Sequence, residues 1–503
     1  MATNPSINFN ISSQGLGQPA DGNDHISGAI FYGSTLPSGF TSSDRIKKVY
    51  SITEAEDLGI DSDYSDGTAA TGAGFTVTAV GADGDTIEVK AAEVYSTVSL
   101  GTYIKVAADT TVTQVGAGIA AAINAKTTEH GYSAASAIGV VTITAPKRMG
   151  EYLNSAGVTT VITGTMTVGS ATTWSSGAGS IFAVWHYHVS EFFRLNPQGV
   201  LYIGVYAYNA VFTEIKTVQD FAEGQIRQGL VYTTEALTTS QVTAIQAVCD
   251  TLYSENQPMV VFLNPNTVSI TTIATLPNLN GLDSEMVSVA IGQDLTGVGN
   301  FLYNTNGVSV GCGGTLLGAE SRALVSENIA WTGAFRLDSG DEFDKLAFSN
   351  GVTYLSASVS ALNSLSTYKY VYVKKFGADY PGSFFNVDLT CTASTSDFSR
   401  IRNNRTMQKA VRNVRTALLP YLNSPININT DGTLTQDVID NFSSVCERTL
   451  DQMRSANEIS QRQVLINPAQ DLLSTNTLTI GIKIIPIGSA EYITVNIGFA
   501  TSF

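Results

Sequence analysis

The chain has 503 residues, a formal net charge of −16 and a hydrophobic content of 43%. Its length allows several hydrophobic cores, and its negative charge argues against nonspecific binding of the whole protein to nucleic acid or to an anionic membrane surface. Charged residues make up only 14% of the chain, below the average of about 25% for soluble proteins, and 45 residues are glycine. This composition favours a protein that buries much of its surface against copies of itself.

The first residues predict a short strand followed by a flexible linker. Residues 6–12 alternate apolar and polar side chains, with Ile7, Phe9 and Ile11 at the apolar positions. Glycine, proline and asparagine then recur, a composition typical of a linker that lets a strand reach away from its own domain. We interpret residues 1–25 as an N-terminal arm. Its strand pairs either at the edge of its own sheet or with a neighbouring molecule.

The central part of the chain predicts one domain interrupted by another. Residues 26–66 and 175–390 alternate strands with helices, which indicates a middle α/β domain with a largely parallel sheet. Between them, residues 67–174 are rich in threonine, valine, alanine and glycine, with strand patterns around one clear helix at 113–125. We interpret this segment as an inserted β-rich domain that lies on the exterior of its host.

Residues 391–503 predict a C-terminal assembly domain that begins with an amphipathic helix between residues 397 and 422. Its apolar positions recur every three or four residues, at Met407, Val411, Val414, Leu418 and Leu422. Basic side chains fall on the opposite side of the helical wheel, at Arg402, Arg405, Lys409 and Arg412. The pattern therefore predicts one apolar, buried face and one strongly basic face.

The rest of this domain predicts a second helix and a hairpin. The helix begins at Thr433 or Thr435, where Thr433 and Gln436 have the spacing of a capping box. Strands are predicted at residues 477–485 and 492–499, joined by a turn at the proline and glycine between them. The last strand has four apolar positions, which are Ile493, Val495, Ile497 and Phe499.

Several short motifs resemble chemical sites, and each has a simpler explanation. The histidines of residues 186–188 and Glu191 are spaced so that neither a helix nor a strand brings them to one side, which argues against a metal site. Residues 311–314, Gly-Cys-Gly-Gly, lack the lysine of a phosphate-binding loop and favour tight helix packing. Asp341 and Glu342 are expected in an exposed loop with nothing apolar to raise a pKa. We therefore predict no catalytic residue, no metal, no cofactor and no enzymatic activity.

The cysteines and the first residues indicate the cellular compartment in which the protein is expected. The four cysteines lie far apart without a CxxC pair and are interpreted as small core residues of a reducing compartment: Cys249, Cys312, Cys391 and Cys446. The chain shows neither the basic and apolar regions of a secretory signal nor an apolar run long enough to span a bilayer. Neither ordinary secretion nor membrane insertion is expected.

Four stretches carry a resemblance to a known family. They are a helix of small residues, GCGGTLLGAESRALVSENIAWT, a strand pair, YVYVKKFGADYPGSFFNVD, a long basic helix, DFSRIRNNRTMQKAVRNVRTALL, and an insertion that contains VGAGIAAAINAKT and VVTITAPKRMGE. In their order along the chain, with the insertion first, they resemble the contractile tail sheath proteins of myovirus-type bacteriophages and of phage-like contractile injection systems. The insertion is similar to the outer domain of Mu-like sheaths.

The resemblance implies a structural subunit. Sheath subunits polymerise as stacked rings, here expected to be hexameric, around a tail tube, and contract to drive the tube through a target cell envelope. The implied partners are further copies, the tail tube protein, and the baseplate and tail terminator proteins, with no direct contact to nucleic acid. The strands at both chain ends would be lent to neighbouring subunits. The expected location is a virion tail or an injection-system sheath, assembled in the cytoplasm of the bacterial host.

The basic helix and the overall function each keep an alternative. The basic side chains either line the inner wall of the sheath and meet acidic side chains of the tube, or form a solvated face, or pair with Asp437, Asp440 and Glu447 of the second helix. The rival function is a non-contractile tail tube or another virion structural or surface protein, which chain ends buried in their own subunit would favour. An α/β enzyme would need a pocket of converging polar groups, and no candidate set is found.

Overall fold

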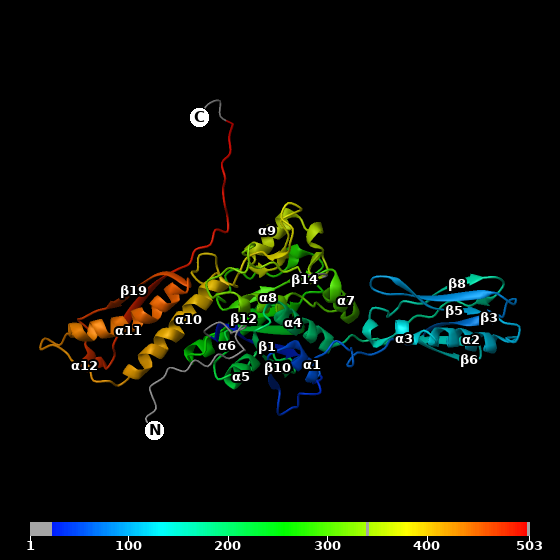
Figure 1. The fold of residues 1–503 in the computed structure, drawn as a ribbon, viewed down its shortest axis with the longest axis horizontal. Helices are drawn as coiled ribbons and strands as arrows, with labels where there is room; N and C mark the ends of the chain where they lie inside the picture. Colours follow the sequence, from blue (N-terminus) through cyan, green and yellow to red (C-terminus); the bar gives the residue numbers. More distant parts are fainter. Residues whose placement is uncertain (1–22, 339–341, 500–503) are drawn as a thin grey trace, which may run out of the picture.

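The computed structural model describes residues 23–338 and 342–499. It is a mixed α/β protein with several sheets, and its parts follow one another along a line (Figure 1). The C-terminal helices lie at one end, a seven-stranded sheet with its helices lies in the middle, and the predicted insertion lies at the other end. The predicted N-terminal strand with Ile7, Phe9 and Ile11 lies outside the described residues.

A largely parallel sheet forms the middle of the molecule, as predicted. Its strand order is β16-β13-β12-β11-β1-β10-β2, and only the edge strand β2 runs antiparallel to its neighbour. The strands are β1 (Ile26–Tyr32), β2 (Ile46–Val49), β10 (Val200–Tyr206), β11 (Gln228–Ala236), β12 (Val260–Asn266), β13 (Val287–Ala290) and β16 (Tyr370–Val371). Every residue of β1 is buried, because helices cover both faces of the sheet.

The helices enclose two hydrophobic cores, one on each face of this sheet. The first face is covered by α1 (Ile52–Asp57), α4 (Ile181–Leu195), α7 (Gly297–Asn306) and α8 (Gly313–Arg322). The second face is covered by α5 (Glu214–Phe221), α6 (Thr239–Ser254) and α9 (Val359–Thr367). Two short strand pairs complete this part, β14 (Gly292–Asp294) with β15 (Leu346–Phe348) and β17 (Val373–Lys374) with β18 (Phe384–Phe385).

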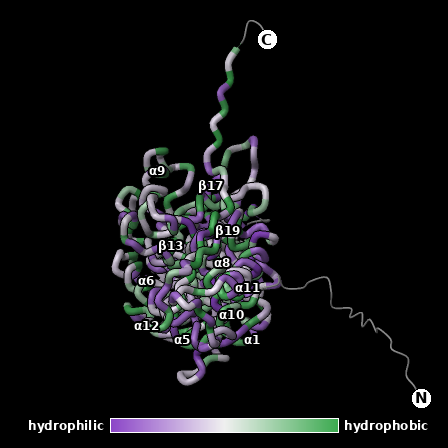
Figure 2. The backbone as a smooth tube through the Cα atoms, turned by 90° about the vertical axis from the view of Figure 1, so that its left-hand side faces the viewer, coloured by the Kyte–Doolittle hydropathy of each residue, from purple (hydrophilic) through white to green (hydrophobic). Residues whose placement is uncertain are grey.

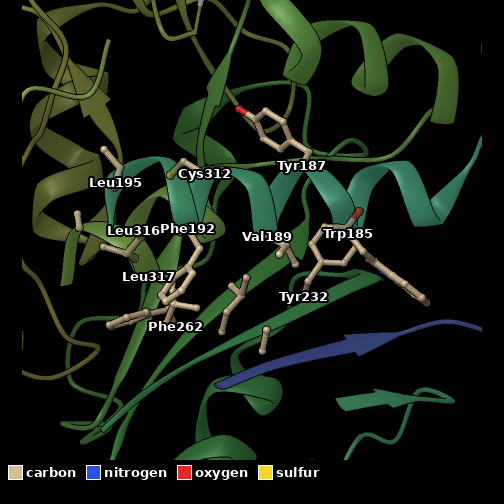
Figure 3. Packing of buried hydrophobic residues seen from close by; sticks show 14 of the residues in the cluster. Trp185, Tyr187, Val189, Phe192, Leu195, Tyr232, Phe262, Cys312, Leu316 and Leu317 are labelled. Atoms are coloured by element: carbon tan, nitrogen blue, oxygen red, sulfur yellow. The ribbon is translucent and has the colours of Figure 1, made fainter. Parts of the chain in front are cut away.

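Helices α4 and α8 pack closely because glycine in α8 faces the backbone of α4. Side chains of both helices, among them Phe192 and Leu317, belong to one buried cluster (Figure 3). A Cβ atom added to Gly314 would lie 2.2 Å from the carbonyl oxygen of His188, too close for any side chain. The Gly314 N–H donates to Nδ1 of His188 at 3.1 Å, and the Gly313 N–H donates to the side chain of Asn264 at 2.9 Å. Residues 311–314 therefore serve helix packing, as predicted, and the first amides of α8 already have acceptors.

The insertion has its own core, enclosed by a four-stranded sheet of order β6-β7-β3-β9, a three-stranded sheet of order β5-β4-β8 and helix α2. The strands are β3 (Ala73–Ala79), β4 (Thr86–Ala92), β5 (Thr97–Ile104), β6 (Ser133–Ala137), β7 (Val140–Thr144), β8 (Thr159–Thr163) and β9 (Thr167–Val168), and the helices are α2 (Val112–Asn124) and α3 (Thr127–His130). The predicted helix is confirmed, and the strand patterns at residues 74–80, 85–89, 139–144 and 158–163 correspond to β3, β4, β7 and β8, whereas β5, β6 and the two-residue β9 were missed.

The chain enters and leaves the insertion side by side. Thr68 and Ala178 form an antiparallel bridge, in which the Thr68 N–H donates to the Ala178 carbonyl oxygen at 2.9 Å. Just before this bridge, the carboxylate of Asp66 accepts hydrogen bonds from the first amides of α4, those of Ile181 at 2.9 Å and Phe182 at 3.2 Å. Two paired segments, here called the paired neck, thus join the insertion to its host, and Asp66 ties them to the N-terminal end of α4.

The C-terminal part contains two packed helices and a hairpin, but the hairpin is not the predicted one. Helix α10 (Ile401–Leu418) packs against α11 (Gln436–Ser455), and β19 (Ile459–Ile466) pairs antiparallel with β20 (Ile480–Pro486), with the short α12 (Leu472–Thr475) between them. The prediction that residues 477–485 pair with 492–499 is wrong, because β19 is the neighbour of β20. Strand β19 was missed because four successive positions, 460–463, are polar.

Replacing residues 69–177 by Asn-Gly should leave the rest of the chain folded. The Thr68–Ala178 bridge already has the geometry of a hairpin end, and Asp66 is kept. We expect a cooperative thermal transition and retained near-ultraviolet circular dichroism. Adding Asp66→Ala to the shortened chain should lower its melting temperature, because the first amides of α4 lose their acceptor. Failure of the shortened chain to fold would mean that the insertion and its host share a core.

Candidate assembly site on helix α10 and the C-terminal tail

The four basic side chains of α10 are turned into the protein. Arg402 is 8% exposed and Arg405 is 2% exposed, and the side chains of Lys409 and Arg412 are also mostly covered. The apolar positions of the helix, which were expected to be buried, are only half-buried, and Leu422 just beyond it is 70% exposed. The basic side chains of this helix are therefore covered at least as well as the apolar ones, which the helical wheel did not predict.

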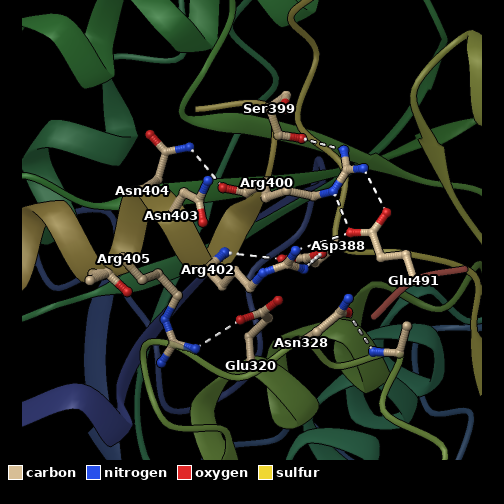
Figure 4. A network of polar contacts seen from close by, with 12 residues as sticks. Glu320, Asn328, Asp388, Ser399, Arg400, Arg402, Asn403, Asn404, Arg405 and Glu491 are labelled. Atoms are coloured by element: carbon tan, nitrogen blue, oxygen red, sulfur yellow. Dashed lines mark hydrogen bonds and ion pairs between the residues drawn. The ribbon is translucent and has the colours of Figure 1, made fainter. Parts of the chain in front are cut away.

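Arg405 forms an ion pair with Glu320 that is closed off from solvent (Figure 4). Its Nη1 lies 2.8 Å from Oε2 of Glu320, and its Nη2 donates to the carbonyl oxygen of Ala323 at 3.2 Å. Burial raises the pKa of Glu320 to about 7, although the charge of Arg405 acts in the opposite direction. Because Glu320 belongs to α8, this pair fixes α10 to a helix that covers the central sheet.

A second network joins the start of α10 to the end of the described chain. Arg400 binds both carboxylate oxygens of Glu491 at 2.8 Å, and Arg402 lies 3.0 Å from the same carboxylate and 2.6 Å from Asp388. Hydrogen bonds from Arg400 and Arg402 lower the pKa of Glu491 to about 2, against the effect of its partial burial. Burial raises the pKa of Asp388 to about 6. Glu491 is therefore a firmly ionised anchor.

A third network ties α10 to the start of the described chain. Lys409 lies 2.5 Å from Oδ2 of Asp24 and also pairs with Glu458, and Arg412 lies 3.5 Å from Oδ1 of Asp24. Burial lowers the pKa of Arg412 to about 9. Asp24 lies two residues before β1, so it marks the root of the predicted N-terminal arm. One helix thus holds the roots of both chain ends.

These contacts correct the expectations for the basic face. In the described chain the four side chains form no exposed stripe that could meet a tube, because each has a carboxylate partner inside the subunit. The partners are also not the expected ones on α11, since Glu447 pairs with Arg462 and Asp440 accepts a hydrogen bond from Gln436. Sequence spacing offers no signal for the true partners, which approach α10 only through the fold.

The predicted last strand is an extended tail that has no partner strand within the described residues. Residues 492–499 project from the body, and hydrophobic and hydrophilic positions alternate along them (Figure 2). Ile493 is 80% and Ile497 is 92% exposed, and Val495 and Phe499 are exposed as well. An alternating apolar strand in water exposes both its side chains and its backbone groups, which is typical of a strand that pairs with another molecule.

The β19–β20 hairpin provides edges to which such a strand could bind. One face of the hairpin packs on α11 through Val464, Ile482 and Ile484. No other strand of the described chain lies beside either β19 or β20, so the outer edge of each strand is unpaired there. The hairpin and the tail together therefore contain both a donor and an acceptor for strand addition.

The other motifs have structural roles. His186 lies 2.9 Å from Glu56, His188 is buried against α8, and Glu191 binds Arg194, so the three candidate metal ligands face different partners. Among the described residues, no cluster of three or more histidine, cysteine, aspartate or glutamate side chains fits a metal ion. No helix in the described ranges is both long and apolar enough to cross a bilayer. The four cysteines are free and buried, as predicted.

Glu342 does not lie in an exposed loop, as had been predicted. It is half-buried beside Asp294, and burial raises its pKa. Burial likewise raises the pKa of Asp294 to about 8. The prediction failed because residues distant in sequence cover this loop, among them the N-terminal end of α7, whose Val298 N–H donates to Glu342 at 3.4 Å. Asp341 lies outside the described residues.

Arg405→Met should destabilise the subunit by about 3–5 kcal/mol, because it leaves the Glu320 carboxylate buried without its counter-charge. The double variant Arg405→Met with Glu320→Gln should recover part of this loss, since no buried charge remains. Arg454→Ala is the matched control, because Arg454 pairs with Asp451 at an exposed site where an ion pair contributes about 0–1 kcal/mol. Urea unfolding measures all three. If Arg405→Met and Arg454→Ala lowered the free energy of unfolding equally, a structural role of the buried pair would be contradicted.

Acidification should destabilise the protein through His188. Burial lowers the pKa of His188 from 6.5 to about 3, so between these values the unfolded chain binds a proton that the folded chain does not. Stability contributed by neutral His188 is therefore lost as the pH falls below about 6.5. In His188→Asn the side-chain oxygen can still accept the Gly314 N–H, and stability should fall less steeply with acidification. Urea unfolding midpoints of the wild type and of His188→Asn at about pH 7, 6 and 5 test this prediction. It would be contradicted if the midpoints of both proteins fell equally with pH.

Comparisons with known proteins give matches to part of the sequence and to the fold. Residues 397–503 match the C-terminal domain of DUF2586, whereas no curated protein matches the sequence. The chain is similar to a chain of the anti-feeding prophage baseplate, with 11% identity, a TM-score of 0.43 and coverage of 63% of this chain and 80% of that chain. It is also similar to the anti-feeding prophage helical sheath in the contracted state, with 13% identity, a TM-score of 0.43 and coverage of 62% and 81%.

Proposed function

We propose that the protein is the structural subunit of a contractile tail sheath, which polymerises around a tail tube and contracts to drive that tube through a target cell envelope. The observation that carries the proposal is the C-terminal tail, an apolar strand that is anchored at Glu491 and exposed beyond it. The order of sequence motifs, which resembles that of sheath proteins, supports the choice of this assembly over others.

Strand addition is the proposed means of polymerisation. The tail of one subunit, residues 492–499, would pair with a free edge of the β19–β20 hairpin of a neighbour, and the strand at residues 6–12 would pair with another edge. The length of the tail suits this role, since its eight residues are one more than those of β20 and as many as those of β19. Each added strand gains several backbone hydrogen bonds, each of about 1 kcal/mol net, and buries alternate apolar side chains. Two such links per subunit form a continuous mesh.

The proposed domain arrangement follows the same logic. Residues 26–66 and 175–390 would form the body of each ring, residues 67–174 an outward domain, and residues 391–503 the assembly domain. Separate cores on the sheet, in the insertion and beside α11 support these divisions, as does the paired neck at Thr68. Proposed partners are further copies in hexameric rings, the tail tube, the baseplate and the tail terminator. Chain ends buried in their own subunit would have favoured a non-contractile tube, and the exposed tail is the opposite arrangement.

Substituting the apolar face of the tail should abolish polymerisation without affecting the subunit. In Ile493→Ser, Val495→Ser and Ile497→Ser combined, the melting temperature should not change, because these side chains are exposed in the single subunit. Tubes with a hollow core, seen by negative-stain electron microscopy of the wild type, should be absent. The matched control is Thr494→Ser with Asn496→Ser on the other face of the strand, which should assemble. Normal tubes from the triple variant would rule out donation of this strand.

A further inference from the structure

The tail has a local alternative that it does not adopt. Residues 487–491 join β20 to the tail, and connections of about this length commonly close β-hairpins. Folding back would let the tail pair with the free edge of its own β20. The short connection gives this pairing an effective concentration in the millimolar range, far above that of a neighbouring molecule in dilute solution. A device is therefore needed that keeps the tail away from its own hairpin.

We propose that the binding of Glu491 by Arg400 and Arg402 is this device: it fixes the root of the tail on α10, so that the strand is presented to a neighbouring copy of the chain and not to its own β20. The first half of this proposal concerns the single subunit alone. The second half, the neighbouring copy, rests on the proposed function.

The hydrogen bonds of Glu491 fix the direction in which the tail leaves α10. Two parallel hydrogen bonds between Arg400 and Glu491, both 2.8 Å long, set the orientation of the carboxylate as well as its position. Arg402 adds a contact of 3.0 Å and is itself held at 2.6 Å by the fully buried Asp388 (Figure 4). The anchored group therefore cannot rotate freely about α10.

The path of the chain on either side of the anchor agrees with this role. Residues 487–493 line a groove of about 920 Å³ that is also lined by Trp331, Phe376 and Val387 of the middle part of the chain. The root thus crosses from the hairpin onto the middle part before the tail projects from the body (Figure 1). This route leads away from the outer edge of β20, with which the tail would otherwise pair.

Loss of the contacts of Glu491 with Arg400 and Arg402 should let the tail pair with β20 of its own subunit. Glu491→Gln removes the charge that both arginines bind, and Arg400→Gln removes the bidentate partner while Arg402 keeps its contact with Asp388. In either variant the tail is free to close on β20. A subunit in this form has neither a donor strand nor a free β20 edge.

Hydrogen exchange on dilute, monomeric protein tests the first half. In the wild type, amides of residues 492–499 should exchange as fast as in an unfolded peptide. In Glu491→Gln and in Arg400→Gln, their protection should rise by about tenfold or more, together with that of residues 480–486, and should not depend on protein concentration. Glu447→Gln is the matched control, because it removes an ion pair with Arg462 in the same part of the chain without touching the tail. Unchanged exchange of the tail in both variants would overturn the proposal.

Assembly measurements separate this proposal from the proposed function. If the anchor directs the tail to a neighbour, the protein concentration at which tubes first form should be higher for Glu491→Gln than for the wild type and for Glu447→Gln. Increased protection in the monomer, combined with normal tubes from the triple tail variant, would refute strand donation and leave the anchor supported. Tail protection that is already high in the wild-type monomer would overturn the anchor, whatever the protein assembles into.

Discussion

Ion pairs between α10 and distant parts of the chain determine how the C-terminal part is held. The helix meets carboxylates on α8, before β1, after α11 and at the root of the tail, through Glu320, Asp24, Glu458 and Glu491. Apolar helix faces tolerate small rotations and translations, whereas ion pairs with directed hydrogen bonds are satisfied in few arrangements. Such pairs add little net stability, because desolvation offsets most of the attraction. Their effect is to give α10 a single position.

The features that are determined by residues close together in the sequence could be predicted. The parallel sheet, the β-rich insertion, the helix at 113–125 and the two C-terminal helices all follow from hydrophobic periods within short windows. Helix α11 begins after Thr435, one of the two predicted starts, but the predicted Thr433–Gln436 capping box is wrong, because Gln436 donates to Asp440 and no side chain among the described residues caps the helix. The candidate strand residues Ile493, Val495, Ile497 and Phe499 were likewise found by alternation alone, and they lie together on the exposed tail.

What depends on distant partners could not be predicted. A row of basic side chains on a helix is usually solvated, and this row is turned inward by carboxylates on distant segments, such as the buried Glu320 and Asp388. Strand alternation indicates a strand but does not identify its neighbour, so β20 was paired with residues 492–499 and the polar β19 was missed. Glu342 was misplaced for the same reason, since the α7 end that covers it lies in another part of the sequence.

The shared attachment of both chain ends to α10 has a mechanical consequence. Asp24 is bound at Lys409 and Arg412, and Glu491 at Arg400 and Arg402, so the two attachment points lie about 10–18 Å apart along the helix axis, at about 1.5 Å per residue. Tension on the N-terminal side reaches the central sheet through the covalent chain, because β1 begins two residues after Asp24. The ion pairs of α10 add a second path, which runs lengthwise through one helix to the root of the tail. The insertion lies outside both paths, so it can tilt or shift relative to adjacent molecules while the load is carried.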